Sequence, residues 1–169
     1  TPADLNLTGV TGFIVKWQKS ADAGFASPID IPFPTSPLTG LAIGPLNTTT
    51  YFRAVVKSGV CPESSSSATQ VTVNPLPVPV ITGTDSVNVG TSGHVYSTAA
   101  GMTNYDWSVS PGGTITSGTG TSSVTVAWNA GGAQFVKVNY RSANGCTAPS
   151  PSTFNVAVNS RPVAVGVTI

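Results

Sequence analysis

A repeat with a fixed spacing constrains the fold of this chain more than any other feature of its sequence. Cys61 and Cys146 are 85 residues apart, and Asn74 and Asn159, each of which ends a Val-X-Val-Asn run, have the same separation. Self-similarity at a fixed distance indicates copies of one folding unit in tandem. The sequence therefore predicts two homologous modules within its 169 residues.

Each module has the sequence pattern of β-strands. The chain contains no long stripe of apolar residues at helical spacing, and it places short β-branched and aromatic runs between clusters of Gly, Pro, Asn and Ser. We therefore expect an all-β protein made of two β-sandwiches in tandem. The predicted strands cover residues 13–19, 50–57, 69–73, 94–98, 105–109, 123–128, 135–141 and 154–158.

The repeat also predicts where the modules begin and end. We expect a first module over residues 1–75, which starts at its second strand and lacks its first, and a second module over residues 76–160. A short Pro-rich linker at residues 74–79 joins them. Residues 161–169 repeat the opening of the second module, so we expect the first strand of a following module or a donor strand there. The chain would then be two periods of a longer array.

Strand alternation assigns the side chains to faces. Trp17, Trp107 and Trp128 are predicted to lie in the cores. Phe13 and Val15 share the predicted inward face of Trp17. The same alternation predicts an inward face for each later strand of the second module, made of Val124, Val126 and Trp128 and of Val136, Val138 and Tyr140.

The strand over residues 50–57 has two apolar faces, and the repeat alone does not choose between them. Alignment with the second module turns Tyr51, Arg53 and Val55 inward, but burial of an unpaired Arg is expensive. We favour the alternative, in which Phe52, Ala54 and Val56 face the core.

Composition argues against several classes of function. Only 8% of the residues are charged, with seven Lys and Arg against six Asp and Glu, and the basic residues are scattered singly. Binding to nucleic acid or to a membrane surface requires clustered basic residues. No apolar run approaches the ~20 residues of a spanning helix. We therefore expect neither nucleic-acid binding nor membrane insertion.

The sequence offers no set of residues for catalysis. His94 is the only His, Glu63 is the only Glu, and the Asp residues are far apart in the sequence. An acid–base pair, a nucleophilic triad or a metal site requires several such groups to converge. We expect His94 at the surface or a sheet edge, and no catalytic, cofactor or metal site, so the chain is predicted not to be an enzyme.

Three motifs in each module match known repeats. They are VKWQ, TYFRAVV and SGVC at residues 15–18, 50–56 and 58–61, and YDWSV, SVTVAW and NGC at residues 105–109, 123–128 and 144–146. The first module resembles immunoglobulin-like repeats of large secreted surface proteins of Bacteroidetes, and the second resembles the PKD-like repeats found beside them. The resemblance implies two immunoglobulin-like β-sandwiches, secreted to the bacterial cell surface as part of an adhesin or a gliding-associated protein.

The chain departs from these repeats at two places. The acidic turn of PKD domains is replaced by Ser-Pro-Gly-Gly at residues 110–113, and neither Cys61 nor Cys146 has the partner that relatives often carry. Because the two Cys residues occupy equivalent positions of separate modules, we expect free thiols or intermolecular disulfides rather than a bond between them. Ser86, in Asp-Ser-Val, matches the short O-glycosylation signal of these secreted proteins.

These observations predict a non-catalytic structural repeat of an extracellular stalk, adhesin or filament. Its partners would be neighbouring repeats or further copies of the chain, joined head to tail by strand complementation through the apolar tail residues Val163, Val165, Val167 and Ile169. The alternative is a glycan-binding or spacer module of a secreted multidomain polysaccharide-degrading enzyme. Surface glycans would then be partners, and Phe25 and Phe33 are the candidate aromatic contacts.

Overall fold

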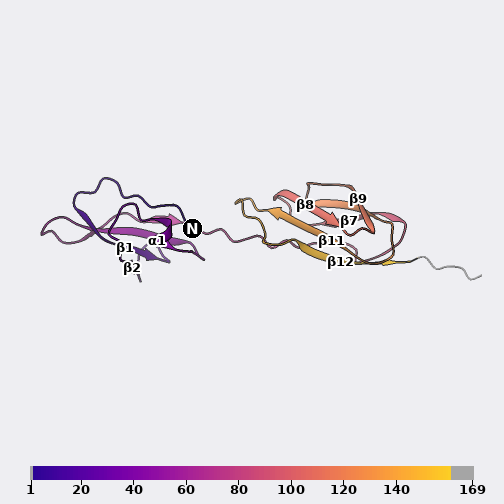
Figure 1. The fold of residues 1–169 in the computed structure, drawn as a ribbon, viewed down its shortest axis with the longest axis horizontal. Helices are drawn as coiled ribbons and strands as arrows, with labels where there is room; N and C mark the ends of the chain where they lie inside the picture. The colour runs from indigo at the N-terminus through magenta and orange to yellow at the C-terminus, as the bar shows by residue number, and fades with distance from the viewer. Residues whose placement is uncertain (1, 161–169) are drawn as a thin grey trace, which may run out of the picture. The chain divides into compact units, whose positions relative to one another are not determined.

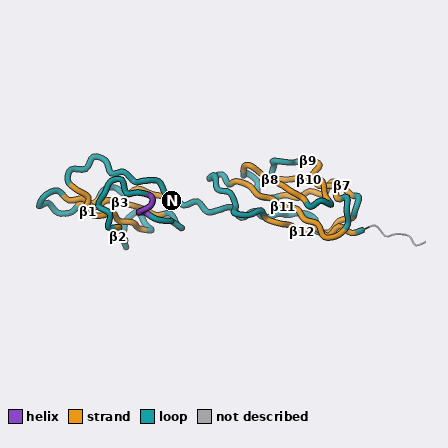
Figure 2. The backbone as a smooth tube through the Cα atoms, in the orientation of Figure 1, coloured by secondary structure: helices purple, strands orange, loops and turns teal. Residues whose placement is uncertain are grey.

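The computed structural model describes residues 2–160, and its contacts divide the chain into two units, Thr1–Asn74 and Pro75–Ile169. Nearly all of the regular structure is β-strand, as Figures 1 and 2 show, which confirms the predicted all-β class. The predicted tail at residues 161–169 lies outside the described residues.

The first unit is built on one antiparallel sheet. The strand order is β2-β1-β3-β4. β5 also pairs with β3, at residues 50–52, whereas β4 pairs with residues 55 and 56. A single helical turn, α1, begins after Thr39, whose side chain accepts a hydrogen bond from the Ala42 N–H. The elements are β1 (Phe13–Ser20), β2 (Ile29–Ile31), α1 (Gly40–Ile43), β3 (Thr50–Lys57), β4 (Ser64–Ser65) and β5 (Thr69–Val71).

The layer that covers this sheet is irregular. Leu5 and Leu38 form an isolated antiparallel bridge, with backbone hydrogen bonds of 2.9 Å in both directions. Leu38 is fully buried and packs with Ile43 of α1 against the sheet. The buried cluster consists of Trp17, Ile31, Leu38, Ile43, Phe52 and Ala54. The first unit is therefore a sandwich with one full sheet and one thin layer.

A bulge in β1 corrects the predicted inward face of that strand. The register with β3 shifts between Ile14 and Lys16, so one residue, Val15, is inserted. The insertion turns Ile14 toward the core, where it packs against the cluster of Trp17, and leaves Phe13 57% exposed. The prediction that Phe13 faces inward was wrong, because strict alternation does not survive an inserted residue.

The face chosen for residues 50–57 is confirmed. Phe52 and Ala54 are buried in the core, and Val56 packs against it. Arg53 lies on the opposite face, where its Nε donates to Gln18 Oε1 at 2.8 Å. Its guanidinium lies 4.2 Å from the centre of the Phe25 ring. A paired and partly covered Arg on the outer face avoids the cost of burying the charge in the core.

The second unit contains two sheets that enclose one core. One sheet has the order β7-β10-β9, and the other has the order β6-β12-β11-β8, in which β6 pairs parallel to β12. The strands are β6 (Ser86–Asn88), β7 (Thr91–Ser97), β8 (Thr103–Val109), β9 (Gly113–Ser117), β10 (Ser123–Trp128), β11 (Gly132–Arg141) and β12 (Ser152–Asn159).

The core of the second unit follows the predicted alternation. Val124 and Val126 of β10, and Val136 and Val138 of β11, are at most 1% exposed. The buried cluster also takes residues from the opening segment of the unit, namely Ile81 and Val87. Each inward face is continuous, which is the arrangement expected of a two-sheet sandwich.

Candidate functional site

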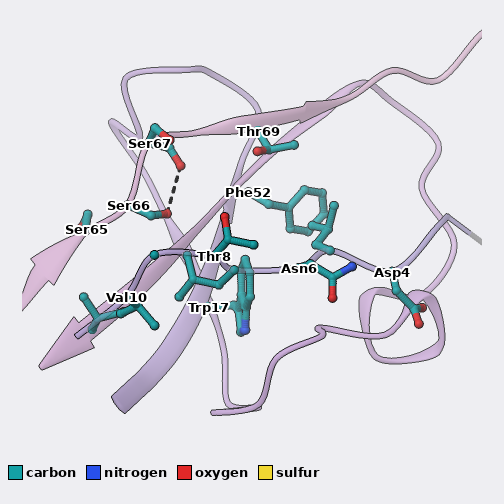
Figure 3. Close-up of a pocket in the computed structure, with 14 residues that line it drawn as sticks. Asp4, Asn6, Thr8, Val10, Trp17, Phe52, Ser65, Ser66, Ser67 and Thr69 are labelled. Atoms are coloured by element: carbon teal, nitrogen blue, oxygen red, sulfur yellow. Dashed lines mark hydrogen bonds between the residues drawn. The ribbon is translucent and has the colours of Figure 1, made fainter. Parts of the chain in front are cut away.

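A groove of about 580 Å³ opens on the first unit, between its N-terminal segment and the strands that close the unit. We call it the edge groove. Figure 3 shows Trp17 beside the N-terminal segment, and Phe52 between the two segments that flank the groove. Its lining residues are Asp4, Leu5, Asn6, Leu7, Thr8, Gly9, Val10, Trp17, Phe52, Val56, Ser65, Ser66, Ser67 and Thr69.

One side of the edge groove has strand edges with no second β-partner among residues 2–160, and the other side is an irregular segment. β4 and β5 pair with β3 alone, so their other edge faces the groove. On the opposite side, residues 6–10 lie outside any strand, and of this side only Leu5 forms a bridge. Unpaired strand edges present rows of backbone donors and acceptors.

The N-terminal side of the groove is held in place by the helical turn. Asp4 Oδ1 accepts a hydrogen bond of 2.7 Å from the Gly40 N–H, and the Leu7 N–H donates to Ser36 Oγ at 3.0 Å. A Cβ at Gly40 would lie 1.9 Å from the Pro2 carbonyl oxygen, so only Gly permits this approach. The segment is thus fixed along the groove although it belongs to no sheet.

The chemistry of the edge groove suits an extended polypeptide. Its lining is mixed: Trp17 and Phe52 contribute little surface because they are 4% and 1% exposed, and most of the other residues carry hydroxyl, amide or backbone polar groups. The only carboxylate in the lining, Asp4, already accepts the Gly40 N–H. Added strands bind through backbone hydrogen bonds at an open edge, with alternate side chains in apolar pockets.

The three tryptophans lie inside the units. Trp17 is 4% exposed, Trp107 is 6% exposed and Trp128 is fully buried. Each indole N–H donates a hydrogen bond: Trp17 to the Thr35 carbonyl at 2.9 Å, Trp107 to the Thr121 carbonyl at 2.8 Å, and Trp128 to the Tyr96 hydroxyl at 3.2 Å. Buried indoles with satisfied donors are fixed in orientation.

The two cysteines belong to different units, and both are free thiols. Cys61 is exposed in the turn after β3, where its N–H donates to the Ser58 carbonyl at 3.0 Å. Cys146 is half-buried in the turn after β11, where its N–H donates to Ser142 Oγ at 3.2 Å.

Two further predicted residues lie on edge strands of the second unit. Ser86 is exposed on β6, and its hydroxyl accepts a hydrogen bond of 3.1 Å from Asn159 Nδ2. His94 is half-buried on β7, with its Nε2 2.7 Å from Thr91 Oγ1. O-glycosylation of Ser86 stays a prediction.

The predicted aromatic pair does not form a platform for a glycan. Phe25 is only 6% exposed, because Arg53 covers its ring, whereas Phe33 is 48% exposed. Stacking on a sugar requires an accessible ring face, so Phe25 is not available for it. Sequence reasoning could not separate the two residues, since both lie in the same stretch without regular alternation.

Two carboxylates on the first unit have lowered pKa values. The Ser20 hydroxyl, which donates to Asp22 at 2.8 Å, and the backbone N–H of Ala26 hold the pKa of Asp22 below its ordinary value of 3.8. The ammonium of Lys16, at 2.7 Å, and the side chain of Gln18 do the same for Asp30. These bonds connect β1 to β2 and fix a loop, and they use the carboxylates fully.

Within residues 2–160 no three His, Cys, Asp or Glu side chains lie close enough together to hold a metal ion. The same part of the chain has no helix with the length and apolar character needed to cross a membrane.

Sequence reasoning missed the edge groove and two residues on its sides, Thr8 and Ser67. A signal for them exists in the repeat. Thr8 precedes Trp17 by the same nine residues that separate Thr98 from Trp107, and Ser67 lies 85 residues before Ser152. The sequence does not show what these two residues could contact, because that is inferred from the contacts of Thr98 and Ser152 in the folded second unit.

Comparisons with known proteins match the two units separately. Residues 1–75 match the model of a domain of unknown function, DUF8696, and residues 74–156 match that of the PKD-like domain. No curated protein matches the chain. A solved structure described as Clostridium thermocellum CbhA fibronectin(III)-like modules has 13% identity, covers 99% of this chain and 91% of its own, and has a TM-score of 0.38.

The PKD-like match and the two-sheet architecture agree for the second unit. PKD-like domains are typically non-catalytic, and their similarity to residues 74–156 supports the resemblance to immunoglobulin-like repeats that the motifs indicated. The chain is thus a pair of β-sandwich modules, the second similar to PKD-like domains, of the kind that serve as structural or spacer units.

Proposed function

We propose that this chain is a non-catalytic structural repeat of an extracellular stalk, adhesin or filament on a bacterial surface. Its partners are neighbouring repeats or further copies of the same chain, which join head to tail by strand complementation through residues 163–169. The function is mechanical: each module is a closed core of its own, and the modules are connected by a short step rich in Pro.

One observation carries this proposal. The two modules repeat each other in sequence, yet the first has an open edge groove while the core of the second takes Ile81 from its opening segment. An open edge in one repeat and the segment 163–169, which repeats that opening, would provide the two halves of a joint between copies. Such a joint is heterologous, so it generates a filament rather than a closed dimer.

The test is self-association of the purified chain at high concentration. We expect light scattering to show masses above the monomer and electron microscopy to show linear oligomers. Deletion of residues 161–169 should return the chain to a monomer. A second variant keeps the length of the tail and replaces Ala164 and Gly166, which correspond to buried Pro79 and Ile81, by Asp, and it should abolish assembly in the same way. Monomers at all concentrations, or assembly that survives the deletion, would refute strand complementation through the tail.

The alternative is a spacer role within a polysaccharide-degrading enzyme, which would also use two folded, non-catalytic modules. It differs because it requires no association between copies. A strictly monomeric chain would therefore move the assignment toward a spacer, and glycan pull-down with the Phe33→Ala variant would then test the exposed aromatic residue.

A further inference from the structure

The edge groove lies where the second unit has its first strand. In the second unit, Thr82 bridges Ser97 of β7, with backbone hydrogen bonds of 2.9 Å in both directions. Ser97 precedes Trp107 by ten residues, and the residue ten before Trp17 is Leu7, which lines the groove. Leu7 is therefore the residue of the first unit that a first strand would pair with, and it lines the groove.

Two hydroxyl groups hold the first strand of the second unit from both sides. The Thr98 hydroxyl donates to the Val80 carbonyl at 2.7 Å, and the Ser152 hydroxyl donates to the neighbouring carbonyl of Pro79. These donors come from the two strands that flank the segment, since Thr98 follows β7 and Ser152 begins β12. The backbone of residues 79–82 is thus clamped by one Thr and one Ser.

The first unit carries the same two residue types at the equivalent positions. Thr8 corresponds to Thr98 by its distance from the strand tryptophan, and Ser67 corresponds to Ser152 by the 85-residue spacing. Both side chains line the edge groove from opposite sides, and both residues are exposed. The clamp is present in the first unit, and among the described residues no strand lies between its two halves.

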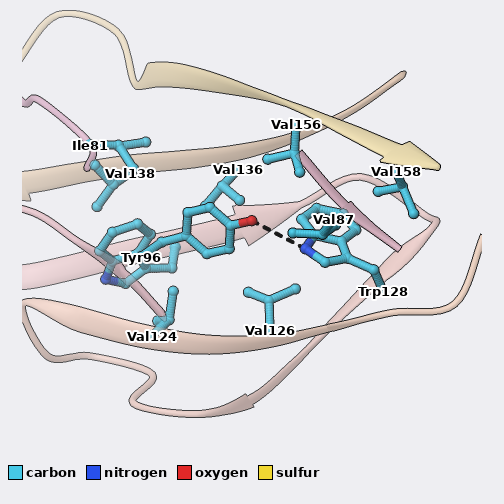
Figure 4. Close-up of a cluster of buried hydrophobic side chains, with 11 residues drawn as sticks. Ile81, Val87, Tyr96, Val124, Val126, Trp128, Val136, Val138, Val156 and Val158 are labelled. Atoms are coloured by element: carbon cyan, nitrogen blue, oxygen red, sulfur yellow. Dashed lines mark hydrogen bonds between the residues drawn. The ribbon is translucent and has the colours of Figure 1, made fainter. Parts of the chain in front are cut away.

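The floor of the groove corresponds to core that the second unit covers. Figure 4 shows Ile81 and Val87, from the opening segment, packed into the cluster of that unit. In the first unit the side chains at the equivalent depth are those of Trp17, Phe52 and Val56, and they line the groove. Trp17 and Phe52 are already only 4% and 1% exposed, so an inserted strand would be held mainly by its backbone hydrogen bonds.

We infer that the edge groove is the acceptor for residues 163–169 of a second copy of the chain, held by Thr8 and Ser67. This inference rests on the proposed joining of copies. The repeat identifies the donor. The segment that follows Asn74 packs into the core of the second unit as its first strand. The segment that follows Asn159 stands at the same place in the repeat, so it is the segment of this sequence that corresponds to a first strand for a following module.

The donor fits the groove in length and in pattern. Residues 4–10 form one side of the groove, and residues 163–169 have the same number of residues, which spans about 23 Å as a strand. By the 85-residue spacing, Ala164 and Gly166 correspond to Pro79 and Ile81, which are buried in the second unit, and Val165 corresponds to Val80, which is 64% exposed. The repeat therefore predicts that Ala164 and Gly166 face the groove.

The experiment separates the acceptor from filament formation. A fluorescent peptide of residues 161–169 is titrated into the chain that lacks these residues, and binding is read by fluorescence anisotropy. We expect saturable binding, and no binding of a peptide in which Ala164 and Gly166, the predicted inward positions, are replaced by Asp. Thr8→Trp, which fills the groove, should weaken binding at least about tenfold, whereas Thr72→Trp, at an exposed position outside the groove, should leave it unchanged.

A second pair of variants guards against a folding defect. Thr8→Val with Ser67→Ala removes both hydroxyls with little change in shape and should also weaken binding, whereas Thr72→Val with Ser64→Ala should not. Circular dichroism verifies that each variant is folded. Absence of saturable binding up to about 1 mM, or equal binding by the groove and control variants, would overturn the acceptor assignment. Assembly of the full chain together with such a result would leave the proposed function standing with a different acceptor.

Discussion

The hydroxyl of Tyr96 provides the sharpest test of how the second core is built. It lies between the two sheets, donates to the Thr84 carbonyl at 3.0 Å and accepts the Trp128 indole N–H at 3.2 Å, as Figure 4 shows for the second bond. Tyr96 and Trp128 are both fully buried, and their rings pack edge to face with centroids 6.3 Å apart. Tyr96→Phe removes the hydroxyl and keeps the ring packing.

The expected loss is about 2 kcal/mol in the free energy of unfolding of the second unit. The Thr84 residue is exposed, so water can replace the bond to its carbonyl at little cost. The Trp128 N–H has no such replacement, and an unsatisfied buried donor costs ~1–3 kcal/mol. For a domain of this size each kcal/mol lowers the Tm by roughly 4–8 °C, so the variant should melt ~10 °C lower.

Urea unfolding followed by near-UV circular dichroism measures this loss. Tyr105→Phe is the matched control, because its hydroxyl also makes two bonds, to the Ala99 carbonyl at 2.8 Å and from the Met102 N–H at 3.0 Å, and neither bond is fully buried. The control should change the free energy of unfolding by less than about 1 kcal/mol. A loss for Tyr96→Phe no larger than that of the control would refute the argument, since water would then reach the Trp128 N–H.

Four further predictions concern alkaline pH, acid pH, a buried ring and a close contact. Burial raises the pKa of Tyr96 above 10.0 in the folded state, with a smaller opposing contribution from the Trp128 bond. The second unit should therefore lose stability as pH rises above about 10. Alkaline unfolding titrations should show that Tyr96→Phe removes this dependence. The lowered pKa values of Asp22 and Asp30 act in the opposite direction, because they stabilise the first unit above pH 3.8 and this stabilisation is lost as pH falls. Asp30→Asn should therefore weaken the dependence of the free energy of unfolding on pH in the acid range. An unchanged dependence would contradict the role given to Asp30. Phe25→Ala should destabilise the first unit by about 3 kcal/mol and Phe33→Ala by less than about 1 kcal/mol in the same urea assay, because only Phe25 is buried; equal losses would show that the exposed fractions mislead. Gly83→Ala should cost about 1–3 kcal/mol, since its Cβ would lie 2.3 Å from the Tyr96 ring, and thermal melting that shows no loss would mean that the ring can move aside.

Much of the architecture follows from local patterns that do not depend on the partner strand. A period of two places Val124 and Val126 on one face wherever β10 lies, so their burial is predictable from the sequence. The 85-residue spacing likewise predicts two modules, because a repeated sequence repeats its local preferences.

The candidate site was predictable only in part. The missing first strand and the apolar tail were visible as departures from the repeat, but the groove that results was not. Its side chains come from segments far apart in the sequence, such as Thr8 and Ser67, and their facing positions exist only when the sheet and the thin layer pack together.

The sequence by itself therefore determined the all-β class, the repeat, and the inward faces of the regular strands. Tertiary structure alone decided that Phe13 is exposed, that Arg53 covers Phe25, and that the edge groove is open in the first unit. The physical reason is the range of the interactions. Alternation is a property of a single strand, whereas a bulge, a covered ring and an open edge depend on which other segments pack beside them.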